Sequence, residues 1–204
     1  MSAPLSIRKG TSLARDVGAA AQELYDALAQ PDIKLAVFYC ASDYDLTALG
    51  DALARRFGDI NLIGCTTAGE ITPQGYLAGA ITGFSLASPD LEVATHKIRL
   101  DPFDSAACAT DIAALLENFG ERGNRPPSES DTFAFFLIDG LAMQEELVVS
   151  CVYQHLQGIE LIGGSAGDDT RFGATHLYHQ GRFETHTALV TLVRTRLPFK
   201  VFRT

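Results

Sequence analysis

Four segments of the chain carry apolar residues at helical spacing, with polar residues between them. Spacings of three and four residues predict amphipathic helices over about 13–28, 46–57, 104–119 and 143–156. The first helix is expected to begin at an N-cap on Thr11 or Ser12 and to end before Pro31. Because each helix has only one apolar face, we expect each of them to lie on a sheet.

Short apolar runs between and after these helices predict strands. Each run is bounded by turn residues and is too short for a helix of ordinary length. The pairing expected in the final hairpin places Tyr178 opposite Phe183. The predicted strands cover 35–40, one from Leu62, 77–86, 91–100, 133–138, one from Leu161, 176–178 and 183–193.

The order of these elements occurs twice. The sequence LIGCTTAGE at 62–70 returns as LIGGSAGD at 161–168. The preceding strands lie at matching distances, since Leu62 is 27 residues after Leu35 and Leu161 is 28 residues after Phe133. Equal spacing of equivalent elements indicates an internal duplication. We therefore expect one α/β domain over 1–204, with two pseudo-symmetric halves of about 5–102 and 103–196 and helices packed on mixed sheets.

Composition narrows the possible partners. The chain has 204 residues, of which 47% are hydrophobic, and its formal net charge is −9. A cationic surface is needed to bind nucleic acid or an anionic membrane, so neither is expected as a partner. No apolar run reaches the roughly 18–20 residues that span a bilayer, and the N-terminus does not resemble a signal peptide. A cytoplasmic location is the resulting expectation.

The four cysteines do not form a recognisable pattern. Cys40, Cys65, Cys108 and Cys151 lie far apart, without a Cys-x-x-Cys pair. In a chain without an export signal, such residues are expected to be reduced thiols and not disulfides or a zinc site. No metal site is expected from the adjacent carboxylates Asp168 and Asp169 with Glu70 either, because neighbouring aspartates at turns usually bond to nearby backbone.

The two repeated turns are the candidate ligand site. Glycines allow close backbone approach, hydroxyl groups donate and accept hydrogen bonds, and carboxylates can hold an ammonium group. The alternative is that both turns are fixed only by backbone geometry. The candidate ligand-binding residues are Gly64, Cys65, Thr66, Thr67, Glu70, Gly163, Gly164, Ser165, Asp168 and Asp169.

An enzyme is the second possibility for the first turn. A thiol or hydroxyl beside a glycine can act as a nucleophile when a base activates it. Cys65 or Thr66 would then carry a hydrolase or transferase reaction. No sequence signature assigns the base, and Gly164 stands where Cys65 does in the second copy. The expectation is therefore a protein without catalytic residues.

Three motifs in order resemble a known family. GCTTAGE at 64–70, DGL at 139–141 before a helix, and GGSAGDD at 163–169 are similar to the N-terminal part of the FIST domain of signal-transduction proteins. The resemblance extends over about 5–193. It implies a sensory domain that binds a small ligand, with amino acids suggested for the family, and it implies a C-terminal FIST region that this chain does not contain.

One branch of the family adds a cofactor and partners. These relatives bind haem and respond to nitric oxide, and they act through histidine kinases or cyclic-di-GMP enzymes. By this resemblance, haem is the possible cofactor. If haem binds, His176 and His186 of the predicted final hairpin are the candidate axial ligands, because imidazole is a common haem ligand. The hypotheses left open are a sensor for haem-bound nitric oxide or for an amino-acid-like metabolite, a hydrolase or transferase, and an interaction scaffold without a ligand.

Overall fold

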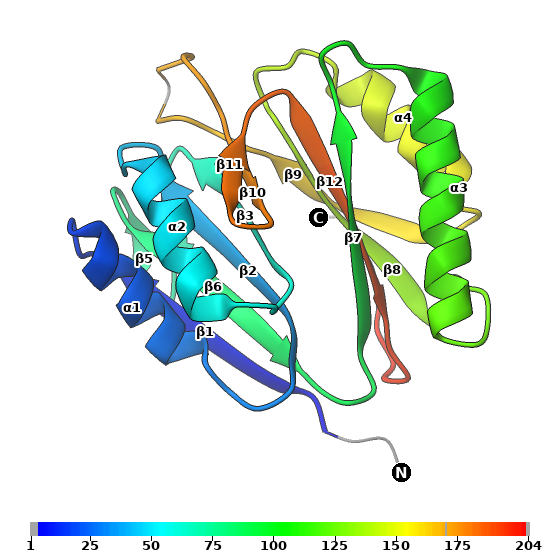
Figure 1. The fold of residues 1–204 in the computed structure, drawn as a ribbon, viewed down its shortest axis with the longest axis horizontal. Coiled ribbons are helices and arrows are strands. Elements are labelled where there is room, and N and C mark those ends of the chain that lie inside the picture. The colour runs from blue at the N-terminus through cyan, green and yellow to red at the C-terminus, as the bar shows by residue number, and fades with distance from the viewer. Residues whose placement is uncertain (1–3, 170, 203–204) are drawn as a thin grey trace.

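The computed structural model describes residues 4–169 and 171–202 and consists of four layers (Figure 1). Two sheets pack face to face in the middle, and a pair of helices covers the outer face of each. This arrangement confirms the expected α/β halves with helices packed on mixed sheets. The helices are α1 (Val17–Leu28), α2 (Leu46–Phe57), α3 (Ser105–Arg122) and α4 (Glu145–His155).

The first sheet has six strands and the second has four. The first runs in the order β1-β6-β2-β3-β10-β11 and the second in the order β7-β12-β8-β9, while β4 and β5 form a separate hairpin. The strands are β1 (Ser6–Ser12), β2 (Ile33–Ala41), β3 (Leu62–Thr67), β4 (Glu70–Thr72), β5 (Gly75–Leu77), β6 (Ile81–Ala87), β7 (Glu92–Arg99), β8 (Thr132–Ile138), β9 (Glu160–Ser165), β10 (Leu177–His179), β11 (Arg182–Glu184) and β12 (Thr187–Arg194).

The duplication is visible in the strand order. β1-β6-β2-β3 and β7-β12-β8-β9 have the same sequence of pairings, with two antiparallel pairs followed by one parallel pair. The repeated units are therefore 6–87 and 92–194. The division between them lies at 88–91 and not at the expected 102–103, because β7 is the first strand of the second unit.

The first strand was missed by the sequence patterns. Residues 6–12 form β1, and Asp16 caps α1 by accepting a hydrogen bond from the Ala19 N–H at 2.8 Å. The expected N-cap on Thr11 or Ser12 is thus wrong. β1 is an edge strand whose residues are mostly exposed, so its sequence SIRKGTS lacks the alternation that marks a half-buried strand.

Two of the later predicted strands are each divided. The run 77–86 is interrupted at Gly79, which has a φ of 73°, between β5 and β6. The run 183–193 is interrupted at His186, which has a φ of 49°, so β11 lies in the first sheet and β12 in the second. The predicted pairing of Tyr178 with Phe183 is confirmed in the β10–β11 hairpin.

The hairpin β10–β11 joins the two halves. Its residues belong to the second unit, but β10 pairs antiparallel with β3 of the first sheet. A central apolar layer lies between the sheets and includes Val37, Ile63 and Cys65 from one side and Leu137 and Leu189 from the other. In the described part of the chain, no helix has both the length and the apolar character needed to cross a membrane.

A buried arginine fixes the end of the second sheet to α3. Arg194 is 1% exposed, and its Nη1 lies 2.9 Å from Glu92 Oε2. Its Nη2 donates to the carbonyl oxygens of Arg125 at 3.1 Å and Phe119 at 3.4 Å. The guanidinium also lies over the Phe119 ring, 4.5 Å from the centroid. The Arg194 side chain therefore pairs with one carboxylate and donates hydrogen bonds to two carbonyl groups.

We expect Arg194→Met to lower the free energy of unfolding by about 2–3 kcal/mol, because hydrogen bonds from a charged donor to buried carbonyl groups are lost. Arg196→Met is the matched control. Arg196 is 74% exposed and lies 4.0 Å from Asp90, so its loss should cost less than about 1 kcal/mol. Urea unfolding of the three proteins measures both values, and equal losses would contradict the structural role of Arg194.

Candidate functional site

The two repeated turns lie against each other. The Gly167 N–H donates to the Thr66 carbonyl oxygen at 2.9 Å. A Cβ atom at Gly167 would lie 3.0 Å from the Ala68 nitrogen, so only glycine allows this approach without a shift of the backbone. The structure therefore brings together the two turns that the sequence singled out.

The first turn is buried and its polar groups are used internally. Cys65 is 2% exposed and belongs to the apolar layer between the sheets. Thr66 is fully buried, and its hydroxyl oxygen accepts the His176 N–H at 3.0 Å. The Thr66 N–H in turn donates to the His176 carbonyl oxygen at 2.9 Å. These groups hold the segment that leads into β10 and are not open to a ligand.

The Glu70 carboxylate forms hydrogen bonds within its own loop. Glu70 is 1% exposed and accepts hydrogen bonds from the Thr67 hydroxyl at 2.7 Å and from the Ala80 N–H at 3.0 Å. Burial raises the pKa of Glu70, and these two hydrogen bonds oppose that shift. Thr67 and Glu70 thus join the turn after β3 to the start of β6.

The carboxylates of the second turn have different surroundings. Asp168 accepts the N–H groups of Phe172, Gly173 and Ala174 at 3.1, 2.6 and 3.2 Å. Burial alone would raise the pKa of Asp168, but these hydrogen bonds hold it below its usual value. Asp169 is half-buried and accepts the Ser42 hydroxyl at 3.2 Å. Asp168 is therefore a loop anchor, and Asp169 is the more accessible of the two.

The remaining residues of the second turn are exposed. Gly163, Gly164 and Ser165 end β9, which is the outermost strand of the second sheet. They line a cavity of about 200 Å³ together with Phe136 and Val149. The second turn thus differs from the first, because its strand has one open edge.

Asp139 bonds to the chain at one candidate histidine and next to the other. It accepts the His186 N–H at 2.6 Å, and it also accepts the Thr175 hydroxyl. The His186 side chain is exposed, while that of His176 is half-buried. Burial lowers the pKa of His176, and the nearby Asp139 carboxylate opposes that shift.

These histidines do not fit haem. The cofactor needs an apolar slot with an oriented axial ligand, and neither His176 nor His186 lines the 200 Å³ cavity or the larger one described next. Among the described residues, no three His, Cys, Asp or Glu side chains are placed to hold a metal ion.

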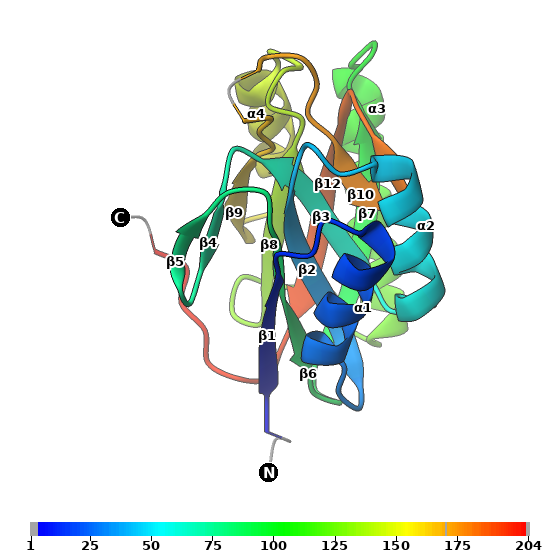
Figure 2. The same ribbon diagram turned by 90° about the vertical axis from the view of Figure 1, so that its left-hand side faces the viewer.

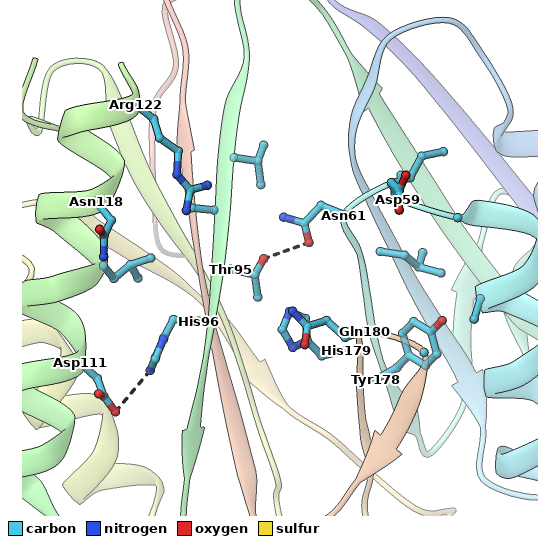
Figure 3. A pocket seen from close by; sticks show the side chains of 18 of the residues that line it. Asp59, Asn61, Thr95, His96, Asp111, Asn118, Arg122, Tyr178, His179 and Gln180 are labelled. Carbon is cyan, nitrogen blue, oxygen red and sulfur yellow. Dashed lines mark hydrogen bonds and ion pairs between the residues drawn. The ribbon is translucent and has the colours of Figure 1, made fainter. Parts of the chain in front are cut away.

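A cavity of about 780 Å³ lies between the two halves, away from the turns (Figure 3). Its walls come from the loop before β3, from β7 and α3, and from the turn of the β10–β11 hairpin. None of the sequence-predicted site residues lines it. The polar side chains that do are Asp59, Asn61, Thr95, His96, Asp111, Asn118, Arg122, Tyr178, His179 and Gln180.

One wall of this cavity carries both charge signs. His96 Nε2 lies 3.3 Å from Asp111 Oδ2, which is an ion-pair distance, but it has no hydrogen-bond partner among the described residues. In the same part of the chain, the side chains of Asn118 and Arg122 make no hydrogen bond or ion pair. Figure 3 shows Asp111, Asn118 and Arg122 projecting from α3 into the cavity.

The polar side chains in the rest of the cavity are more constrained. The Thr95 hydroxyl lies 2.9 Å from that of Thr191 and donates to Asn61 Oδ1 at 3.1 Å. Burial, and then the Lys97 cation, hold the pKa of His179 below its usual value. His179 is therefore a neutral imidazole near pH 7, able both to donate and to accept one hydrogen bond.

Sequence patterns did not reveal this cavity because its residues come from five separate segments. The only local signal is the spacing of Asp111, Asn118 and Arg122, which places them on one side of α3. From the sequence alone, that side of α3 does not differ from an ordinary solvated helix face. Only the fold places the β10–β11 turn opposite it.

The four thiols should be unreactive in the folded protein. All are buried, and burial raises the pKa of Cys65 to about 12. Because the thiolate is the reactive species, we expect a thiol reagent to label none of the four quickly at neutral pH. Labelling of all four in denaturant is the control, and rapid labelling of native Cys65 would contradict this assignment.

Acid should weaken the fold through His176. Its pKa is lowered in the folded state, so the unfolded chain takes up a proton first as the pH falls below about 6.5. The free energy of unfolding should therefore decrease as the pH falls through this window. We expect His176→Gln, which cannot titrate, to reduce the difference between pH 7.5 and pH 5.5. Parallel curves for the two proteins, or an NMR titration with a raised pKa, would exclude this role.

Comparison with solved structures finds distant similarity. A cyanuric acid hydrolase from A. caulinodans is 11% identical, with a TM-score of 0.49 over 95% of this chain and 72% of that one. A second cyanuric acid hydrolase structure is 8% identical, with a TM-score of 0.46 over 95% of this chain and 68% of that one. No protein with a curated description matches the sequence.

A family model gives the assignment. The FIST N domain model matches residues 34–204, which is most of the chain. The matched part contains both repeated turns, both walls of the large cavity and the hairpin that joins the halves. The resemblance noted from the three motifs is thereby confirmed. This chain belongs to the FIST N domain family, whose members are sensory domains of signal transduction.

Proposed function

We propose that this domain senses a small zwitterion of the amino-acid type in the 780 Å³ cavity between its halves. The observation that carries the proposal is the buried His96 Nε2, which has no hydrogen-bond partner among the described residues and lies on the cavity wall that also carries Asp111 and Arg122. Buried polar groups are normally hydrogen-bonded, so an unpaired buried atom at a cavity that also has exposed polar groups of both charge signs indicates a ligand.

The spacing on α3 suits a zwitterion with well-separated charged groups, such as a diamino acid. Arg122 and Asn118 lie one helical turn apart and can hold an α-carboxylate, since guanidinium groups bind carboxylates through paired hydrogen bonds. Asp111 lies two turns before Asn118, about 10 Å along the helix axis, and can hold a side-chain ammonium group beside His96. Leu115 and Ala114 supply apolar surface between the two ends.

The position of the cavity supports a sensory role. One wall belongs to the second half, and the opposite wall includes Asp59 and the β10–β11 turn, which is attached to the first sheet. A ligand in contact with both walls would favour one relative position of the two sheets. Such a preference can pass occupancy to a partner when the partner also binds one position better. A histidine kinase or a cyclic-di-GMP enzyme is the partner proposed here.

Two other functions are less well supported. A hydrolase or transferase with Cys65 as nucleophile requires a thiolate, whereas burial raises the pKa of this thiol to about 12. Thr66 is fully buried, and its hydroxyl is already bonded to backbone. A haem sensor would have to use His96 or His179, the two imidazoles in the large cavity, within largely polar walls.

Ligand binding can be tested with the twenty amino acids and their close metabolites. At a hundred times its dissociation constant, a true ligand adds about 2.7 kcal/mol of stability, which raises the melting temperature by roughly 5–10 °C. We expect Arg122→Ala to weaken that ligand about 10- to 100-fold in calorimetry, through loss of a charged hydrogen bond. Asp111→Asn should weaken it as well.

Arg55→Ala is the matched control, because Arg55 is exposed on α2 and does not line the cavity. It should leave the affinity unchanged. Absence of any shift across the panel would favour the interaction scaffold. A Soret band on addition of haem that is lost in a His96→Ala or His179→Ala variant would favour the haem sensor. Either result would overturn the zwitterion proposal.

A further inference from the structure

The two halves contain equivalent hairpins. β4–β5 follows β3, and β10–β11 follows β9, the equivalent strand of the second half. Each hairpin has three paired positions and two residues in its turn. Superposing the two registers makes Ile71 equivalent to Tyr178 and Tyr76 equivalent to Phe183.

The second hairpin completes an edge of the first sheet. β10 pairs antiparallel with β3, with Tyr178 opposite Gly64. The rings of Tyr178 and Phe183 lie 5.1 and 5.9 Å from the Phe38 ring, and Tyr178 is 2% exposed. Gly64 makes room for this cluster, because a Cβ atom there would collide with the Phe38 ring.

The first hairpin has no such partner in the described structure. β4 and β5 pair only with each other, and they project from the side of the first sheet (Figure 2). Ile71 is 86% exposed and Tyr76 is 68% exposed. The Tyr76 hydroxyl donates to the Ala68 carbonyl oxygen at 2.8 Å, which orients the ring without burying it. Two large apolar side chains are therefore presented to solvent at the positions that are packed in the other hairpin.

β9 is the matching open edge. Among the described strands it pairs with β8 alone, and Gly163 lies opposite Phe136, just as Gly64 lies opposite Phe38. The 200 Å³ cavity beside Gly163 is lined by Phe136 and Val149. In the first half, the equivalent position is filled by Tyr178 and Phe183. In the second half it is hollow.

The sequence of β9 leaves this edge unprotected. Natural sheets discourage edge-to-edge pairing with charged side chains. The other three outer strands carry them within the strand or at both of its ends, with Arg8 and Lys9 in β1, Lys97 in β7, and Arg182 and Glu184 in β11. β9 reads ELIGGS, so its only charge stands at the first residue. An edge of this kind is suited to accept another strand.

We propose that the β4–β5 hairpin of one copy of this chain adds antiparallel to β9 of a second copy. Ile71 and Tyr76 then enter the cavity beside Phe136, and Glu70 and Thr72 lie opposite Gly164 and Ile162, as the register of β10 on β3 requires. The main-chain hydrogen bonds of the added strand supply affinity, and the two side chains supply specificity.

The partner is a second copy of this chain, because the chain itself contains both the β4–β5 hairpin and the β9 edge. Among the described strands, β4–β5 is a hairpin that joins neither large sheet and β9 is the outer strand with the matching glycine, and the internal pairing of β10 with β3 shows how the equivalent elements fit. Within one chain, β4 instead packs against β2 and β6. Two copies can exchange hairpins reciprocally, which closes the assembly as a dimer. This inference does not depend on the identity of the ligand in the large cavity.

Sedimentation across a concentration series tests the assembly. We expect the wild type to dimerise, more tightly at higher salt because each copy has a net charge of −9. Ile71→Glu should weaken the dimer about 10- to 100-fold, since a charge replaces a side chain that is buried in the dimer contact. Ile7→Glu is the matched control, because Ile7 is 56% exposed on the β1 edge and should not matter.

Disulfide trapping tests the register. Thr72→Cys and Ile162→Cys are made as separate variants with tags of different size, and the four native cysteines do not interfere because they are buried. Mixing under mild oxidation should give a covalent heterodimer that Ile71→Glu abolishes, whereas Gln74→Cys with Ile162→Cys should give little. A monomer at every concentration, a dimer insensitive to Ile71→Glu, or an edge that binds only a peptide of another protein would overturn the proposal.

Discussion

The antiparallel pairing of β10 with β3 is the interaction on which the rest of the structure depends. It carries a strand of the second half into the first sheet, and the contacts of Thr66 with His176 and Gly167 fix where that strand arrives. Because of this exchange the two sheets face each other, the apolar layer between them closes, and the β10–β11 turn reaches the wall opposite α3. The large cavity exists only because the halves are joined in this way.

The strand and turn that are repeated in the two halves have different surroundings. In the first half, the turn after β3 is sealed by the arriving hairpin, and its threonine and glutamate are consumed by backbone contacts. In the second half, the equivalent glycines remain at an open edge beside a small hollow. The polar residues that are free to meet a small ligand are instead on α3, where Asn118 and Arg122 face the loop before β3. The proposed ligand cavity and the proposed dimer contact therefore lie on separate surfaces.

Sequence patterns predicted the parts that are locally determined. The four helices have one apolar face each, and the expected range 46–57 is that of α2, which lies between the N-cap Asp45 and the C-cap Gly58. The repeat was visible because both strand ends keep the same glycine. β1 could not be predicted from its exposed residues, nor could the switch of sheets at His186, since both depend on pairing partners far away in the chain. The turns were recognised but their chemistry was not, because only tertiary contacts show that Thr66 and Asp168 are already bonded.

The crossing of β10–β11 also has a consequence during synthesis. Strands β1 to β6 are complete once Ala87 has been made, but the edge of β3 is covered only by residues 177–184. The ribosome must add about 100 further residues in between, which takes roughly 5–20 s at ordinary translation rates. Throughout this interval the inner face of the first sheet, with Val37 and Ile63, has no second sheet to cover it. The nascent first half is therefore expected to expose an apolar sheet face until its own second half emerges.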